Sequence, residues 1–121
     1  AHLNEQPIQV SACRDLQAAL LHTELGVQMT AVSRRLAQME RLIRHPVHAI
    51  RMHGSAAMGM AWVAMGAAEA YFERGIKAWD ICAGTVIVRE AGGHVGPYEE
   101  MTEEGEFEIA GGQVMACCNQ E

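Results

Sequence analysis

Asp80 is the carboxylate with the most unusual surroundings in the sequence. It follows a short turn at residues 74–77 and directly precedes a nearly uncharged run, residues 81–88. A carboxylate at the mouth of a buried element is unfavourable unless a partner compensates its charge. One such partner is the start of a helix, where an N-cap carboxylate is favoured by free N–H groups and the helix dipole. The other is a hard cation such as Mg²⁺, for which the carboxylate is an oxygen ligand. Capping preference favours the N-cap, and both alternatives remain open.

Two further positions place polar groups where a ligand could meet them. Gly54 and Ser55 precede Ala56, where a helix is predicted to begin, and the N–H groups of a first helical turn suit an anion. Glu73 stands just before a glycine-containing turn, where its carboxylate could accept hydrogen bonds from substrate hydroxyl groups. Each pattern is common in proteins that bind nothing there, so neither indicates a function by itself.

The histidines and the acidic residues near the C-terminus are weaker candidates. His45, His48 and His53 suggest a transition-metal site. Alternate strand positions point to opposite faces, however, so these three are not expected to converge. The glutamates at residues 99–108 are interpreted as a solvated edge.

The elements that must position these residues alternate between strands and helices. A hairpin is predicted at residues 1–11 and a buried strand at residues 16–21. An amphipathic helix is predicted from Thr30 to Arg44, where Pro46 ends it. Further predicted elements are a strand at 47–53, an Ala- and Met-rich helix at 56–65 buried on most sides, and short strands at 70–72, 94–95, 107–109 and 114–117.

Residues 79–91 are locally ambiguous. The Thr-Val-Ile-Val run at residues 85–88 has strand propensity. The distance from Asp80 to the glycine pair at residues 92–93 suits a helix of about three turns. With either assignment, the alternation predicts an α/β or α+β class.

Composition limits the classes of protein that fit. The chain has 121 residues, enough for one domain, and is 50% hydrophobic and 20% charged, as globular proteins are. A formal charge of -6 argues against a nucleic-acid partner. No apolar run approaches the roughly 20 residues that cross a bilayer, and no secretory signal is visible. Four irregularly spaced cysteines favour reduced thiols and a cytoplasmic location.

A longer pattern is specific to one family. Residues 79–93 begin with Trp-Asp, continue through small residues and an apolar run, and end in Glu-Ala-Gly-Gly. This segment resembles the C-terminal signature of the inositol monophosphatase family. Flanking segments resemble the family in the same order, weakening over residues 96–105; they are Asn-Glu-Gln-Pro at 4–7, Thr-Glu-Leu-Gly at 23–26, Met-Glu-Arg-Leu at 39–42, Val-His-Ala-Ile-Arg at 47–51, Gly-Ser-Ala-Ala at 54–57 and Ala-Tyr-Phe-Glu-Arg-Gly at 70–75.

The resemblance implies a fold and an activity. The fold would be the C-terminal half of a layered α/β sandwich, with mixed strands and about three helices. The activity would be Mg²⁺-dependent, lithium-inhibited hydrolysis of inositol monophosphates to inositol and phosphate, in a cytoplasmic homodimer. By resemblance, Asp80 matches a metal ligand, Glu73 matches a glutamate that binds inositol hydroxyls, and Gly54, Ser55 and Ala56 match a turn beside the substrate. No nucleic-acid or membrane partner is implied.

The chain also departs from the family pattern. The family's Glu-Glu and Asp-Pro-x-Asp-Gly-Thr motifs do not occur, and the first residue is Ala1. We therefore expect residues 1–121 to be the C-terminal portion of such a domain, without its metal-binding N-terminal half and without a complete catalytic set. The isolated chain is expected to be inactive and to leave apolar surface uncovered. A non-catalytic truncated member that serves as a binding or dimerisation module is the alternative.

Overall fold

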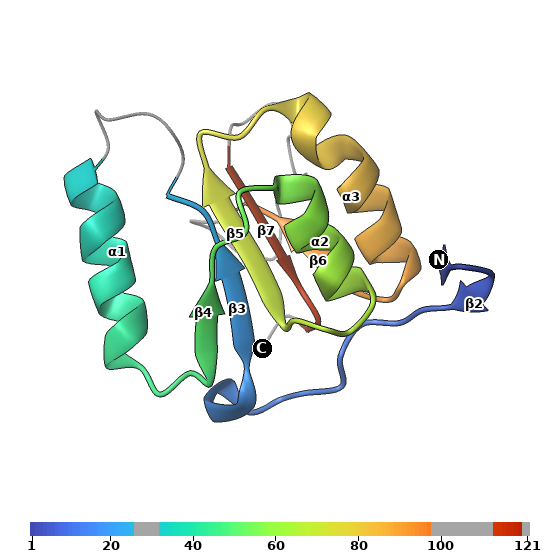
Figure 1. Ribbon diagram of the computed structural model, residues 1–121, viewed down its shortest axis with the longest axis horizontal. Helices are drawn as coiled ribbons and strands as arrows, with labels where there is room; N and C mark the ends of the chain where they lie inside the picture. Colours follow the sequence, from blue (N-terminus) through green and yellow to red (C-terminus); the bar gives the residue numbers. More distant parts are fainter. Residues whose placement is uncertain (26–31, 98–112, 120–121) are drawn as a thin grey trace.

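A five-stranded mixed sheet forms the centre of the protein (Figure 1). The computed structural model describes residues 1–25, 32–97 and 113–119. The strand order is β4-β3-β5-β7-β6, in which β3 is parallel to β4 and β5, and β7 is antiparallel to β5 and β6. The strands are β3 (Leu20–Thr23), β4 (Ala49–Arg51), β5 (Ala70–Arg74), β6 (His94–Gly96) and β7 (Gln113–Cys117). The predicted α/β class is confirmed.

The sheet buries a different hydrophobic cluster on each face. Successive strand residues point to opposite faces, so Tyr71 belongs to one cluster and Phe72 to the other. The first cluster lies under helices α2 (Ala56–Ala64) and α3 (Ala78–Glu90), which together cover one face of the sheet (Figure 1). The second cluster is smaller and receives the half-buried Leu42 from helix α1 (Val32–Arg44).

Helix α3 resolves the ambiguity at residues 79–91. Its buried residues are Ile81, Gly84, Thr85 and Val88, a spacing of three and four positions that only a helix places on one side. Val86 and Ile87, which raised the strand propensity, lie on the exposed side of the helix. Packing against α2 and the sheet therefore outweighs local propensity, and the strand alternative is wrong.

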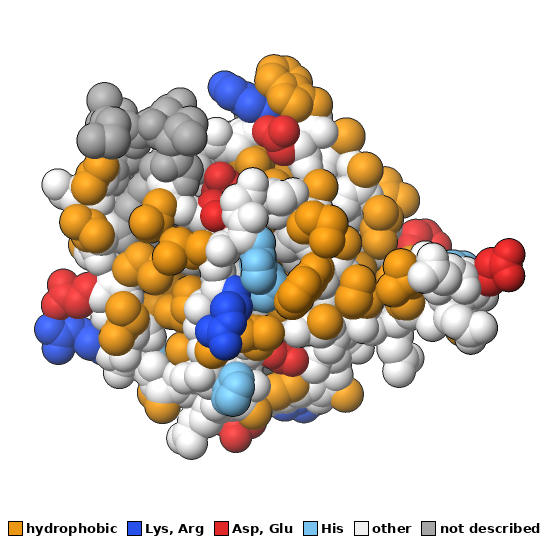
Figure 2. All heavy atoms as spheres, viewed as in Figure 1, with side chains coloured by type: hydrophobic (Ala, Val, Ile, Leu, Met, Phe, Trp, Pro, Cys, Tyr) orange, Lys and Arg blue, Asp and Glu red, His pale blue; other side chains and the backbone are white. Residues whose placement is uncertain are grey.

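Helix α1 is an amphipathic surface helix, as predicted, but it leaves apolar side chains uncovered. Leu36 is 58% exposed and Ile43 is 69% exposed. Figure 2 shows hydrophobic side chains across the α1 side of the molecule. Arg44 and Glu40 form an exposed ion pair one helical turn apart, at 2.6 Å. The predicted N-cap, Thr30, lies outside the described residues.

The N-terminal segment confirms one prediction and corrects another. Strands β1 (His2–Leu3) and β2 (Gln6–Pro7) form the predicted hairpin, and positive φ angles at Asn4 (48°) and Glu5 (66°) give the turn the twist that hairpins favour. The strand predicted at residues 16–21 is wrong in its first half. Leu16–Ala18 forms a 3-10 helix because the Asp15 carboxylate accepts the N–H of Gln17 at 2.9 Å, and the strand begins at Leu20.

The remaining predicted elements agree with the structure except in extent. The strands at 47–53, 70–72, 94–95 and 114–117 correspond to β4, β5, β6 and β7. Gly66, at φ 74°, follows α2 as predicted. That helix is buried on most sides, as predicted: Met60 and Val63 are fully buried, Trp62 is half-buried, and only Ala57 and Met58 are exposed. The strand predicted at 107–109 and the acidic residues at 99–108 lie outside the described residues.

No helix in the described ranges is long and apolar enough to cross a membrane.

His22 is a buried polar residue that the sequence did not single out. Its side chain on β3 is 1% exposed and packs against the rings of His53 and Trp62, with ring centroids 4.7 and 5.1 Å away. Neither ring nitrogen has a hydrogen-bond partner among the described residues. Burial, followed by repulsion from His53, lowers the pKa of His22 below 6.5, although Glu24 and Glu69 act in the opposite direction.

We expect His22 to make folding stability depend on pH. Because the folded pKa lies below the unfolded value, the unfolded chain binds the proton more readily. The stabilisation is therefore complete above the unfolded pKa of about 6.5 and is lost as the pH falls through the folded pKa. In urea titrations at about pH 7.5 and about pH 5.5, His22→Phe should reduce the loss of stability on acidification. The exposed His48, changed to Gln, serves as the control; an identical loss in wild type and His22→Phe would contradict the prediction.

Candidate functional site

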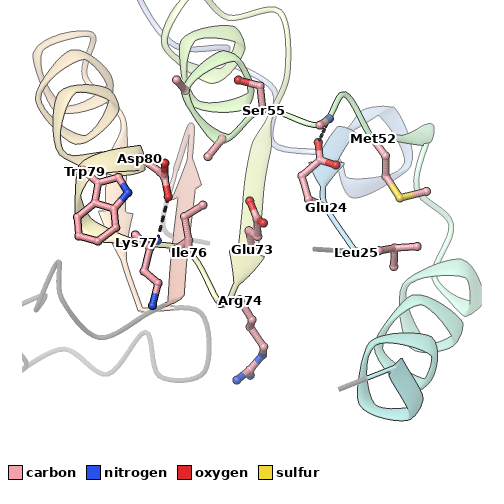
Figure 3. Close-up of a pocket in the computed structure, with 14 residues that line it drawn as sticks. Glu24, Leu25, Met52, Ser55, Glu73, Arg74, Ile76, Lys77, Trp79 and Asp80 are labelled. Carbon is pink, nitrogen blue, oxygen red and sulfur yellow. Dashed lines mark hydrogen bonds between the residues drawn. The ribbon is translucent and has the colours of Figure 1, made fainter. Parts of the chain in front are cut away.

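A cleft of about 880 Å³ lies beyond the carboxyl ends of the three parallel strands (Figure 3). Glu24 follows β3, Met52 follows β4, and Glu73 is next to last in β5, and all three line the cleft. Ligands of open α/β sheets bind at this end because loops and helix N-termini converge there. The five residues singled out from the sequence line the same cleft; they are Gly54, Ser55, Ala56, Glu73 and Asp80.

The turn at Gly54 and Ser55 opens helix α2 toward the cleft. Gly54 has φ 76°, a left-handed conformation that other residues adopt with strain. Ser55 is the N-cap, and its Oγ accepts the N–H of Met58 at 3.3 Å. Ala56 is buried, which holds the first turn of the helix against the core. The predicted helix start is confirmed.

Glu24 holds this turn in place, although no sequence pattern indicated this role for the residue. Its Oε1 accepts the backbone N–H groups of both His53 and Gly54, each at 2.7 Å. A carboxylate that accepts two amide hydrogens holds a loop more firmly than a neutral acceptor does. The partners are 29 and 30 residues away in sequence, so the contact arises only when β3 and β4 pair. The Thr-Glu-Leu-Gly segment at residues 23–26 was the only available signal.

Asp80 stands at the start of α3 but is not its N-cap. Lys77 is the N-cap residue, and Asp80 is the third residue of the helix. Its Oδ2 accepts the backbone N–H of Lys77 at 3.2 Å (Figure 3). The N-cap interpretation is therefore wrong by three positions, although the carboxylate still satisfies a free N–H at the positive end of the helix. Trp79 beside it is 77% exposed at the mouth of the cleft.

Glu73 lies between Asp80 and Glu24 in the cleft (Figure 3). The residue is half-buried, and its Oε2 accepts the hydroxyl hydrogen of Tyr71. The cleft therefore carries three carboxylates from separate elements, with Arg74 and Lys77 among the other lining residues. Hydroxyl groups and cations are both suited to such acceptors.

The described residues do not offer a complete set of metal ligands. Asp80 offers the carboxylate oxygen that Mg²⁺ prefers. Within residues 1–25, 32–97 and 113–119, however, no three His, Cys, Asp or Glu side chains are grouped closely enough to hold a metal. The described residues therefore do not form a metal centre by themselves.

Comparison with known proteins identifies one family. The family model described as "Inositol monophosphatase family" matches residues 1–118. Inositol monophosphatase 1 of Bos taurus and that of Homo sapiens are each 44% identical over 109 residues, covering 84% of this chain and 39% of the relative. The chain thus spans well under half the length of these relatives.

Solved structures show the same fold. The inositol monophosphatase from Anabaena (Nostoc) is 34% identical, with a TM-score of 0.79, over 95% of this chain and 44% of that chain. The extragenic suppressor protein suhB from Bartonella henselae is 30% identical, with a TM-score of 0.81, over 94% of this chain and 42% of that one. The sheet and helices described above are therefore those of an inositol monophosphatase fold.

Proposed function

Because the chain belongs to the inositol monophosphatase family, we propose that it forms the C-terminal portion of a Mg²⁺-dependent phosphomonoesterase acting on inositol monophosphates. The observation that carries this proposal is that Gly54, Ser55, Glu73 and Asp80 line the same cleft. The relatives' greater length supports a further portion of the active site outside these residues.

Each side chain has a proposed task. Asp80 contributes one carboxylate oxygen to a metal site shared with residues that this chain does not supply. Bound Mg²⁺ would polarise the phosphate and neutralise its developing charge. Glu73 accepts hydrogen bonds from the inositol hydroxyls. The Gly54–Ser55–Ala56 turn borders the ring, and Glu24 holds that turn in place.

Assembly and location are also proposed. Reduced thiols at all four cysteines support a cytoplasmic protein. A homodimer and inhibition by lithium follow from family resemblance alone. A negative net charge is compatible with a small-molecule substrate and argues against a nucleic-acid partner.

Phosphate release from inositol 1-phosphate in Mg²⁺ tests the proposed function. The 121-residue chain should release none, because the described residues do not complete a metal centre. The same chain extended by the coding sequence upstream of Ala1 should be active and Mg²⁺-dependent. Turnover by the isolated chain would contradict the shared site, and an inactive, Mg²⁺-insensitive extended protein would contradict the enzyme.

A non-catalytic binding module is the second candidate, favoured by exposed apolar side chains on two helices. On α3, Trp79 is 77% exposed and Val86 is 62% exposed, and α1 exposes Leu36 and Ile43. Such side chains on a small domain are typical of surfaces that associate with another chain. An extended protein that folds and associates but hydrolyses no phosphomonoester would favour this candidate.

A further inference from the structure

Tyr71 is a buried residue whose hydroxyl group contacts a residue that lines the cleft. It lies on β5, is 0% exposed, and shares a face with Glu73, two positions further along the strand. Its hydroxyl donates to Glu73 Oε2. Tyr71 is therefore in direct contact with a carboxylate that lines the cleft.

The phenol acts as a donor because it stays protonated. Burial raises the pKa of Tyr71 far above its usual range, and the hydrogen bond to Glu73 and the charge of that carboxylate raise it further. A neutral phenol next to a carboxylate has one hydrogen to donate, so the direction of the bond is defined. The hydrogen bond to one carboxylate oxygen limits rotation of the Glu73 side chain. Ligand binding to Glu73 then costs less side-chain conformational entropy.

Gly59 on α2 makes room for this arrangement. A Cβ at position 59 would lie 2.3 Å from Tyr71 Cδ2, a distance that no packed side chain tolerates. Glycine therefore allows the aromatic ring to lie directly against the helix. The same helix begins at the Ser55 cap, so α2 sets both the position of the turn and, through Tyr71, that of Glu73.

We propose that Tyr71 is a positioning residue for substrate recognition: it holds Glu73 in the orientation that accepts hydrogen bonds from substrate hydroxyl groups. This inference rests on the proposed function, because it requires Glu73 to contact a polyol phosphate. Its consequence is selectivity. Tyr71 should favour phosphomonoesters that carry hydroxyl groups on the alcohol over those that carry none.

The test is Tyr71→Phe in the protein extended upstream of Ala1, assayed with two substrates. Inositol 1-phosphate carries hydroxyl groups that can reach Glu73, whereas phenyl phosphate carries none. We expect kcat/KM for inositol 1-phosphate to fall about five- to tenfold, mainly through KM, because a ground-state contact is lost. For phenyl phosphate the expected change is less than about twofold. Equal losses on both substrates, or no loss on either, would overturn the positioning role.

Gly59→Ala provides a second variant that leaves the tyrosine itself intact. The added methyl group must displace the ring, so the same loss of selectivity is expected. Gly96→Ala is the matched control, since a Cβ there meets nothing within 4 Å. Selectivity that is unchanged in Gly59→Ala would count against the role of the packed ring.

Nuclear magnetic resonance on the 121-residue chain separates this inference from the proposed function. A buried, hydrogen-bonded Tyr71 hydroxyl should give a slowly exchanging proton resonance, absent from Tyr71→Phe and shifted in Glu73→Gln. An unshifted resonance in Glu73→Gln would overturn the positioning contact. If the extended wild-type protein hydrolyses neither substrate, the proposed function itself is overturned, whatever the resonance shows.

Discussion

Asp80→Asn in the protein extended upstream of Ala1 should reduce phosphate release by about a hundredfold or more, because a metal ion contributes several kcal/mol to stabilising the transition state. The amide keeps an oxygen that can accept the Lys77 N–H, so the start of α3 should be retained. It removes the negative charge that a hard cation requires. Turnover should be measured across a Mg²⁺ titration, and the half-saturating concentration should rise.

The control for this variant is Glu90→Gln, which removes one exposed carboxylate from the far end of the same helix. It should leave both turnover and Mg²⁺ dependence unchanged. Thermal melting of Asp80→Asn should match the wild type to within a few degrees. A fully active Asp80→Asn protein with normal Mg²⁺ dependence would restrict Asp80 to capping α3, and the proposed metal ligand would be wrong.

Ile81→Ala should cost about 2–4 kcal/mol of folding free energy, because it removes a fully buried side chain and leaves a cavity. Ile81 is 0% exposed in the cluster between α3, α2 and the sheet. The same cluster supports the first turn of α3, which carries Asp80. Urea denaturation of the 121-residue chain measures the loss as a lower midpoint.

Val86→Ala is the matched control on the same helix. Val86 is 62% exposed, so its truncation should change stability by less than about 0.5 kcal/mol. If Ile81→Ala and Val86→Ala lowered the free energy of unfolding equally, the buried face of α3 that carries Ile81 would not be the face that stabilises the fold. In the extended protein, a larger cost for Val86→Ala than in the 121-residue chain would show that the additional portion covers this side.

Local sequence patterns predicted elements wherever turn chemistry and periodicity agreed. The hairpin at Asn4 and Glu5, helix α1 before Pro46, and helix α2 after Ser55 all carry such local signals. The prediction failed at residues 16–18, where the Asp15 carboxylate bonds to the backbone two residues on and forms a 3-10 turn inside an apolar run. A short apolar run without a clear period does not distinguish a strand from a helical turn.

The candidate site was predictable in its residues and only partly in its geometry. Family resemblance selected Gly54, Ser55, Glu73 and Asp80, and the fold brings them to one cleft. The contacts that hold them were not predictable. Glu24 reaches Gly54 across a pair of strands, and the Tyr71 ring depends on the missing side chain of Gly59.

The sequence alone determined the family, the order of most elements and the residues that border the cleft, because these depend on residue identity and local spacing. Only the tertiary structure decided that residues 78–90 form a helix, that Asp80 is its third residue and not its cap, and that Tyr71 and Glu24 support the cleft. The physical reason is that each depends on packing in the folded chain. Burial against α2 and the sheet outweighs local propensity in α3 and brings the Tyr71 ring against Gly59, and the bonds from His53 and Gly54 to Glu24 exist only after β3 and β4 have paired.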